Sequence, residues 1–544
     1  MSILRYPLQS VRRLRSRLSI GPTAKPWSSR QVNLGCHAWL VAALWGLMIS
    51  FAMSGEEGRY FGIQVVDAET GRGVPLVELE TIEHVRFVTD NAGWIAIDES
   101  AWMGRDVFFF VRSHGYAFPK DGFGFEGTPL KVRAGDRARL SIQRRNRAER
   151  LARTTGAGLL RDSQLLENGV TEPMSPRADV VGCDSVLNAV YRDRLFWFWG
   201  DTSRPHHPLG GSFHMTGATM RLGSTPRVLG LDPMSSAEYF VDDQGVARAV
   251  AAMPGSGPTW LTGVTVVPNA KGNDEMVASY VKIRNGLESY RWGFLRWDDA
   301  VDSFREVRSV ETRPPLFSEP QSHALVHTHE GVSHVYFCNP TPFLRVAATA
   351  EAYAQPDEYE GYTCLMDGTR FSQRRLDRDP GGVLQYRWRR NTPPLTQAEI
   401  AEGIRDGSLK QSDACNRLRD KESQRDLHAH FGSVAWNAYR QRWIMIFTEL
   451  GGESSMLGEV YFAESKALEG PWTTATKVLT HDRYSFYNPK LHPYFDEQGG
   501  RIIHFEGTYT HTFSGNEFPT PRYDYNQVLY RLDLDSVDRS PPAP

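Results

Sequence analysis

Residues Cys183–Thr202 read CDSVLNAVYRDRLFWFWGDT, and this stretch predicts a β-hairpin. Two apolar runs are joined by the polar pair Arg192-Asp193, which is typical of antiparallel strands with a two-residue connection. Asp184 stands where the first strand begins, and Asp201 stands where the second strand ends. Because these points lie at the same edge of an antiparallel sheet, both carboxylates face one side of the fold. Paired carboxylates at a common edge are what acid/base chemistry on a sugar bond needs.

The same hairpin pattern recurs four more times along the chain. It covers residues 260–284, 319–339, 430–449 and 488–507, each with a polar or glycine-containing turn in its middle. Repeats of this kind, each too small to bury its own apolar face, indicate a propeller. The sequence therefore predicts an all-β fold with a five-bladed β-propeller over residues 178–535.

One segment interrupts the propeller pattern. Thr396-Gln-Ala-Glu399 is a capping box, and apolar residues follow it at near-helical spacing. A short helical insertion is therefore expected over about residues 392–426. Such an insertion forms either a lid over the central funnel or a decoration of the surface.

Residues 1–54 have the features of an export signal. Residues 1–35 contain seven Lys or Arg and no acidic residue, and the uncharged apolar run Ala38–Met53 follows. This run is short for a membrane span, and small residues stand at its end. A cleaved signal peptide or an uncleaved signal anchor is expected, and either one places the mature chain outside the cytoplasm: secreted, periplasmic or at the cell surface. Contact with a membrane is expected only if the anchor is uncleaved.

Residues 60–143 form a separate predicted unit. Alternating apolar residues and Gly/Asn/Asp turns indicate short antiparallel strands. The pattern VVDAETGRGVPLVELE followed by TDNAGWIAI resembles the carboxypeptidase-regulatory-like, or transthyretin-like, β-sandwich. That resemblance implies an accessory module without a catalytic role. The basic segment 144–177 is interpreted as a solvated linker that caps the propeller.

The composition and net charge argue against a nucleic-acid partner. The formal net charge of the 544 residues is −2, which gives no reason to expect a nucleic-acid partner. Aromatic residues make up 11% of the chain, and they serve β-folds as core residues and as platforms for sugar rings. Five Cys are present without the spacing of a disulfide framework.

Strand starts and returning strand ends are expected to converge at one end of the central channel. The candidates brought there are Asp184, Asp201, Trp260, Glu319, His323, His430, Glu449, Tyr487, Asn488, His492 and Glu506. Arg522 and Tyr523 follow in a polar, aromatic loop of the last blade that suits sugar stacking and hydrogen bonding to hydroxyl groups. Glycoside cleavage needs one protonated and one ionised carboxyl group, and crowding of carboxylates separates their pKa values. The alternative for any one of these acids is a purely structural role, in which it bonds turn amides.

The hairpin DSVLNAVYRDRLFWFWGDT, the turn Gly470-Pro471-Trp472 and the five repeats resemble the five-bladed propeller glycoside hydrolases, that is, the arabinanase/xylosidase and invertase-like families. The resemblance implies that Asp184 is the base or nucleophile. It also implies that a later Glu is the general acid, with Glu319 the first choice before Glu449 and Glu506. Asp201 would tune the pKa of the acid. The Asp-Pro opening usual in those families is absent here.

The implied activity is hydrolysis of glycosidic bonds in a polysaccharide or oligosaccharide. Two alternatives remain: a non-catalytic propeller that binds glycans or proteins, and a polysaccharide lyase. No cofactor is required for hydrolysis, and a central Ca²⁺ is a possibility that the resemblance adds. His327, His329 and His334 share a hairpin and are a weaker metal candidate, because exposed strand histidines more often have no ligand.

Overall fold

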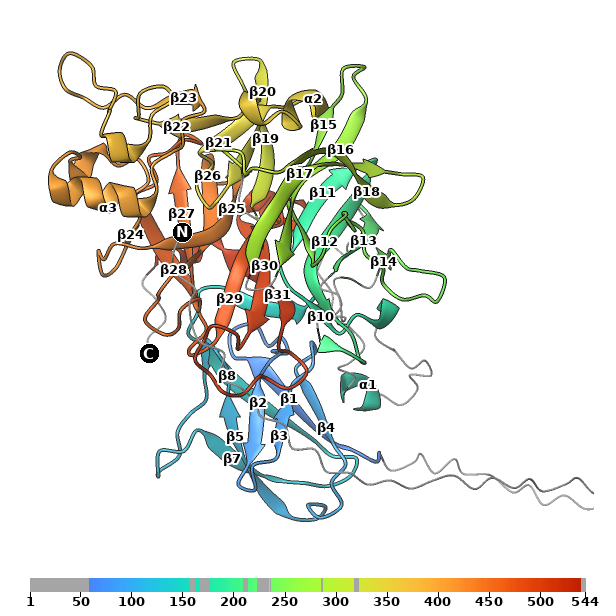
Figure 1. Cartoon of the computed structure of the whole chain (residues 1–544). Coiled ribbons are helices and arrows are strands. Elements are labelled where there is room, and N and C mark those ends of the chain that lie inside the picture. Colours follow the sequence, from blue (N-terminus) through green and yellow to red (C-terminus); the bar gives the residue numbers. More distant parts are fainter. Residues whose placement is uncertain are drawn as a thin grey trace, which may run out of the picture. The chain divides into compact units, whose positions relative to one another are not determined.

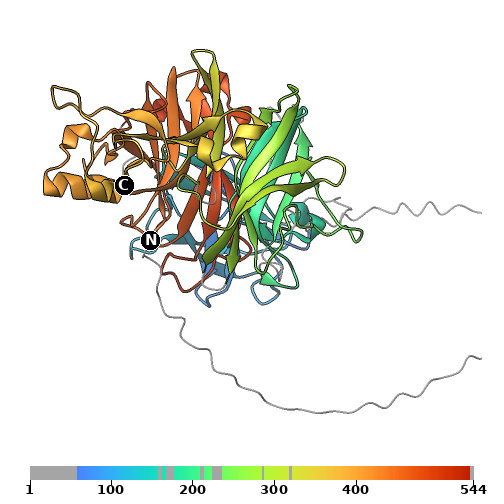
Figure 2. The same cartoon turned by 45° about the horizontal axis from the view of Figure 1, so that its top comes forward.

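The computed structural model describes residues 58–156, 162–166, 177–208, 214–222, 234, 236–284, 287–317 and 322–539. The predicted leader, residues 1–54, lies outside the described residues. Figures 1 and 2 show the chain from two directions. Within the described residues, no helix is long and apolar enough to cross a membrane. The structure is nearly all β, which confirms the predicted class.

Two four-stranded sheets come first along the chain. One has the order β4 (Trp94–Ile97), β1 (Phe61–Asp67), β8 (Arg137–Arg144) and β6 (Tyr116–Ala117). The other has the order β3 (Arg86–Val88), β2 (Glu78–Thr81), β5 (Asp106–Arg112) and β7 (Gly127–Lys131). Ile63, Leu79, Ile95 and Phe109 are completely buried members of one apolar cluster between them. Alternating burial along β2 and β4 reflects the period of two in their sequences.

Five further sheets, here called sheets I to V, are formed by the described residues from Glu149 onward. Sheet I contains β10 (Gly182–Cys183), β12 (Arg194–Ser203), β13 (Met215–Arg221) and β14 (Glu238–Tyr239), with β11 (Leu187–Tyr191) also paired to β12. Sheet II contains β15 (Thr259–Pro268), β16 (Asp274–Arg284), β17 (Glu288–Asp298) and β18 (Ser303–Val310). Sheet III contains β19 (His323–His329), β20 (Val332–Cys338), β21 (Leu344–Ala347), β22 (Glu360–Thr363) and β23 (Arg387–Arg390).

The last two sheets have the same meandering order. Sheet IV contains β25 (Ala429–Asn437), β26 (Arg442–Glu449), β27 (Glu459–Ser465) and β28 (Thr474–Thr480), with β24 (Arg419–Asp420) at its edge. Sheet V contains β29 (Ser485–Leu491), β30 (Ile502–Thr510) and β31 (Asn526–Asp533), with β9 (Glu149–Arg153) at its edge. Strand β9 lies in the basic segment that its sequence led us to interpret as a linker. It pairs antiparallel with β31, the last strand within the described residues.

The hairpin at 183–202 forms as its sequence predicts. Leu187 pairs with Phe198 and Tyr191 with Arg194, which leaves Arg192 and Asp193 as the turn. Both turn residues have positive φ angles, 49° and 59°, as a tight two-residue hairpin requires. Strand β12 is buried along nearly its whole length, because sheet I has neighbours on both faces.

One strand of each sheet contacts one strand of the next sheet, in sequence order: β11 with β15, β15 with β19, β19 with β25, and β25 with β29. Strand β29 also reaches the segment between β10 and β11, where Asn488 Nδ2 donates to Ser185 Oγ at 2.7 Å. Aromatic side chains fill the space between neighbouring sheets. Phe198 of sheet I lies 5.6 Å from Trp297 and 5.1 Å from Phe304 of sheet II, measured between ring centroids.

The three described α-helices are α1 (Asp162–Leu166), α2 (Ala350–Tyr353) and α3 (Gln397–Asp406). The capping box predicted for α3 is confirmed. The Glu399 N–H donates to Thr396 Oγ1 at 3.2 Å, and the Thr396 N–H donates to Glu399 Oε2 at 2.8 Å. Figures 1 and 2 both show α3 at the periphery of the sheets.

Candidate active site

Asp184 lies between β10 and β11, next to the end of β12. Its N–H donates to the Asp201 carbonyl at 3.2 Å, and the Gly200 N–H donates to the Asp184 carbonyl at 2.8 Å. The predicted shared edge of the two acids is therefore confirmed. A Cβ atom at position 200 would overlap Asp184 Oδ1, so a side chain there would displace the carboxylate.

Two tyrosines hold the Asp184 carboxylate. The Tyr487 hydroxyl donates to Asp184 Oδ2 at 3.2 Å, and the Tyr525 hydroxyl is a second donor. Burial raises the pKa of Asp184 to about 6, and these hydrogen bonds limit the rise because they favour the ionised form. Asp184 can therefore ionise near neutral pH while most of its surface is shielded from water.

Asp201 is the second acid of the pair and is 7% exposed. Trp260 Nε1 donates to its Oδ1 at 3.1 Å. Burial raises the pKa of Asp201 to about 8, and the negative charge of Asp184 adds to the rise. Because the two acids interact, they titrate as a pair. At pH values between about 6 and about 8, the pair holds a single proton. An ionised carboxylate thus stands beside a protonated carboxyl group.

A second layer of polar groups supports this pair. Asn488 has a φ of 53° at a bulge in β29, and its side chain reaches Ser185, the residue after Asp184. The Ser185 N–H donates to Thr508 Oγ1 at 2.8 Å. Gln527 Nε2 donates to the same Thr508 oxygen at 2.9 Å and to the Cys183 carbonyl at 3.2 Å. The backbone on both sides of Asp184 is therefore fixed by sheet V.

His492 and Glu506 form a buried pair. Their Nε2 and Oε1 atoms are 3.5 Å apart, and both side chains are 0% exposed. Thr154 Oγ1 donates to Glu506 Oε2 at 3.0 Å, and Asn188 Nδ2 donates to His492 Nδ1 at 3.0 Å. Within the described part of the chain, no hydrogen bond or ion pair joins Glu506 to Asp184. His492, Glu506 and their hydrogen-bond partners are here called the polar centre.

Two further groups face this polar centre. His323 is 2% exposed and lies against the backbone of Asn488. Burial and the neighbouring Lys490 hold the pKa of His323 well below its usual range, so the imidazole is neutral. Burial also lowers the pKa of Lys490 to about 8, which leaves its ammonium largely charged at neutral pH.

These residues do not fit a central Ca²⁺. Calcium prefers six to eight oxygen ligands with several carboxylates. The polar centre supplies the Glu506 carboxylate together with two imidazoles and a cationic ammonium. Within the described residues, no group of three or more His, Cys, Asp or Glu side chains could hold a metal ion, and this includes His327, His329 and His334.

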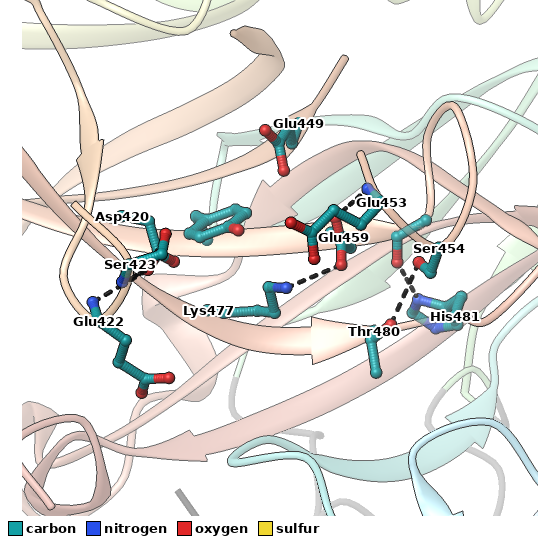
Figure 3. Close-up of polar contacts among 12 residues, drawn as sticks. Asp420, Glu422, Ser423, Glu449, Glu453, Ser454, Glu459, Lys477, Thr480 and His481 are labelled. Atoms are coloured by element: carbon teal, nitrogen blue, oxygen red, sulfur yellow. Dashed lines mark hydrogen bonds and ion pairs between the residues drawn. The ribbon is translucent and has the colours of Figure 1, made fainter. Parts of the chain in front are cut away.

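Glu449 belongs to a separate acidic cluster in sheet IV, which Figure 3 shows. It is completely buried and forms an ion pair with Arg425, whose Nη2 is 3.0 Å from Glu449 Oε2. In the same cluster, Lys477 Nζ donates to Glu459 Oε1 at 2.8 Å. The Ser423 N–H donates to Asp420 Oδ1 at 2.7 Å. The acids of this cluster are thus neutralised or hydrogen-bonded internally.

The remaining predicted residues have different surroundings. The Tyr523 side chain is 0% exposed, and its hydroxyl donates to the Thr89 carbonyl at 2.9 Å. The Arg522 guanidinium is 56% exposed and lies 3.4 Å from Asp162. Burial lowers the pKa of His430 to about 4. Glu319, the expected general acid, lies outside the described residues.

Sequence reasoning did not single out Tyr525, Gly200 or Lys490. Tyr525 belongs to the aromatic stretch 521–526, but nothing in that stretch tells which hydroxyl faces Asp184. Lys490 comes after a strand bulge that shifts its register, and bulges leave no periodic signal.

The paired acids predict how stability depends on pH. Their pKa values are raised on folding, so the native state binds more protons than the unfolded chain above the ordinary Asp value of 3.8. The stabilisation is complete below that value and is lost as pH rises through about 8. We expect the contribution of this pair to the free energy of unfolding, measured by urea denaturation as the difference between the parent and Asp201→Asn, to decrease between ~pH 4 and ~pH 8. The difference between the parent and Asp243→Asn, which changes an exposed acid, should not decrease in this way. A difference between the parent and Asp201→Asn that does not change with pH would contradict the expectation.

Comparisons with known proteins give structural matches only. No protein-family model matches the chain, and no curated protein matches it. It is similar to a β-1,3-galactosidase of family GH43 with a TM-score of 0.35 and 8% identity, over 66% of this chain and 61% of that one. An exo-β-1,3-galactanase from Clostridium thermocellum matches with a TM-score of 0.32 and 11% identity, over 64% and 58%. A Bacillus subtilis levansucrase matches with a TM-score of 0.31 and 9% identity, over 64% and 82%. TM-scores this low do not establish a shared fold, so the function of this chain has to be inferred from its own residues.

Proposed function

We propose that this protein hydrolyses glycosidic bonds in a polysaccharide or oligosaccharide at the site formed by Asp184 and Asp201. The observation that carries the proposal is the backbone hydrogen bond between two neighbouring acids: the partly buried Asp184, held by tyrosine hydroxyls, and the buried Asp201, held by an indole N–H. Hydrolysis of a sugar acetal needs carboxyl groups in different protonation states. Burial and mutual repulsion provide that difference here.

The roles follow from the surroundings of each acid. Asp184 acts as the base or nucleophile, because the hydroxyls of Tyr487 and Tyr525 favour its ionised form. Asp201 stays protonated beside Asp184 and is proposed to tune the pKa of the general acid. Glu319 is proposed as the general acid that protonates the leaving oxygen; it precedes β19 by four residues in the sequence. Trp260 provides an indole next to the acids, which suits contact with a sugar ring.

The proposal includes the finer architecture. Sheets I to V would be the blades of a five-bladed propeller, and residues 60–143 a transthyretin-like sandwich. The sequence-ordered contacts of β11, β15, β19, β25 and β29 support the first part. The basic and apolar leader supports export of the mature chain.

A substrate screen tests the activity. The purified protein is incubated with arabinan, xylan, fructan, β-1,3-galactan and polygalacturonate, and new reducing ends and ultraviolet absorbance are measured. We expect release of reducing ends from at least one substrate, without the ultraviolet absorbance of unsaturated uronates. Absorbing products from an acidic polysaccharide would instead indicate a lyase. Binding without cleavage of any substrate would indicate a glycan-binding propeller.

A further inference from the structure

A cavity of about 570 Å³ lies between the ends of β19, β25 and β29, and is here called the aromatic groove. Its lining includes Leu325, His327, Trp436, Trp443, Lys490 and Tyr494. His327 and Trp436 stand near the turns that end the first hairpins of sheets III and IV. Asp184 stands where sheet I begins, so the groove is separate from the paired acids.

One wall of the groove is aromatic and accessible. Trp436 is 44% exposed, which is unusual for so large an apolar side chain. Its ring centroid is 5.4 Å from that of Trp443, and His327 packs on Trp443 at 4.8 Å. These edge-to-face contacts fix the Trp443 ring between its two neighbours. Flat, fixed indole rings provide contact area at low cost in conformational entropy.

The groove also contains an unpaired cation. Lys490 lines the groove and is 9% exposed, and its charge also acts on His323 and His492 of the polar centre, which adjoins the groove. Within the described ranges, its ammonium forms no hydrogen bond or ion pair with a carboxylate. A buried charge without a partner is costly, so such groups are normally neutralised by a counter-charge. The ammonium therefore provides a binding position for an anion next to the indole wall.

We propose that the aromatic groove binds an acidic oligosaccharide, with a sugar ring against Trp436 and a uronate carboxylate at Lys490. The volume lies within the range of about 300–1,000 Å³ that is common for ligand pockets. A uronate sugar unit carries both an apolar ring face, which matches the indole, and a carboxylate, which matches the ammonium. A neutral sugar has no carboxylate for the ammonium. This binding does not depend on hydrolysis at Asp184.

The test compares two ligands with the same sugar rings, one with charged carboxylates and one with neutral methyl esters. The full-length protein is titrated with tri-galacturonate and with its fully methyl-esterified form, using tryptophan fluorescence and calorimetry. We expect at least tenfold tighter binding of the acid. Lys490→Met should abolish this preference, and Trp436→Ala should weaken binding of the acid at least tenfold. Lys271→Met and Phe123→Ala, which change an exposed lysine and an exposed aromatic residue elsewhere, should bind like the parent.

Asp184→Asn separates this site from the paired acids, because it should leave binding unchanged whether or not the protein is a hydrolase. Trp436 is an exposed residue, so its variant tests the groove even if Lys490→Met does not fold. Equal binding of acid and ester by the parent would overturn the proposal, as would an unchanged affinity in Trp436→Ala. Loss of binding in Asp184→Asn would also overturn it, since the ligand would then occupy the other site.

Discussion

Replacing Asp184 by asparagine is expected to lower the rate of glycoside hydrolysis by about 10²–10⁴-fold, the usual contribution of a general base. Asparagine keeps the shape of the side chain and one acceptor oxygen for Tyr487. It cannot take up a proton or attack a sugar carbon, however. The fold should therefore persist while the chemical step is lost, and a kcat decrease with little change in KM is the expected signature.

The pH profile gives an independent view of the same residue. Activity should rise as Asp184 ionises, through a pKa of about 6 in the free enzyme. Asp201 is still protonated in this pH range, so Asp201→Asn replaces one neutral group by another. We therefore expect the rising limb of that variant to stay close to that of the parent.

Asp496→Asn is the matched control for Asp184→Asn. Burial raises the pKa of Asp496 to about 7, so this residue is a second shielded acid, but it lies after β29 rather than beside β10. Its variant should keep the parent's activity. A fully active Asp184→Asn protein would rule out the proposed role, and Asp184 would then be a structural turn residue.

Replacing Arg153 by methionine is expected to destabilise the protein by about 3 kcal/mol, because buried carbonyl groups lose their donors. Arg153 lies in β9 and is 1% exposed. Its guanidinium donates to three backbone carbonyls, those of Thr155 at 2.7 Å, Val181 and Arg522. It also lies over the Tyr523 ring, 5.4 Å from the centroid. Methionine can fill part of the space but donates no hydrogen bond.

The three carbonyls belong to segments that support the candidate site. Val181 precedes Asp184 by three residues, and Arg522 precedes Tyr525 by three residues. Arg153→Met should therefore lower activity as well as the midpoint of urea unfolding. Arg522→Met removes a guanidinium that is 56% exposed, and it should change stability by less than about 1 kcal/mol. Equal stability of the two variants would show that the Arg153 hydrogen bonds contribute little.

Much of the fold could be predicted because it depends on neighbours in the chain. The turn at Arg192-Asp193, the strands on either side of it and the α3 capping box each involve residues within a few positions of one another. Local chemistry of this kind leaves a direct pattern in the sequence. The shared edge of Asp184 and Asp201 followed from the same hairpin, since strand direction alone brings its two ends together.

Strand β9 shows where such reasoning ends. Its sequence, Glu149-Arg-Leu-Ala-Arg153, is charged and is typical of a solvated linker, yet all five residues are buried. They are buried because β31, nearly 380 residues later, pairs with them and because backbone carbonyls surround the Arg150 and Arg153 guanidinium groups. A charged strand of this kind has no local signature, because its partners come from distant segments.

Periodicity, turn chemistry and capping were enough to predict the all-β class, the hairpin with its two acids at one edge, and the helix of the insertion. The packing of the whole chain was needed to show that Tyr487 and Tyr525 hold Asp184, that Glu449 pairs with Arg425 in another cluster, and that Lys490 lines an aromatic groove. Those contacts join segments tens to hundreds of residues apart. Burial and distant charge, which set the protonation of the acids, arise only once those segments pack together.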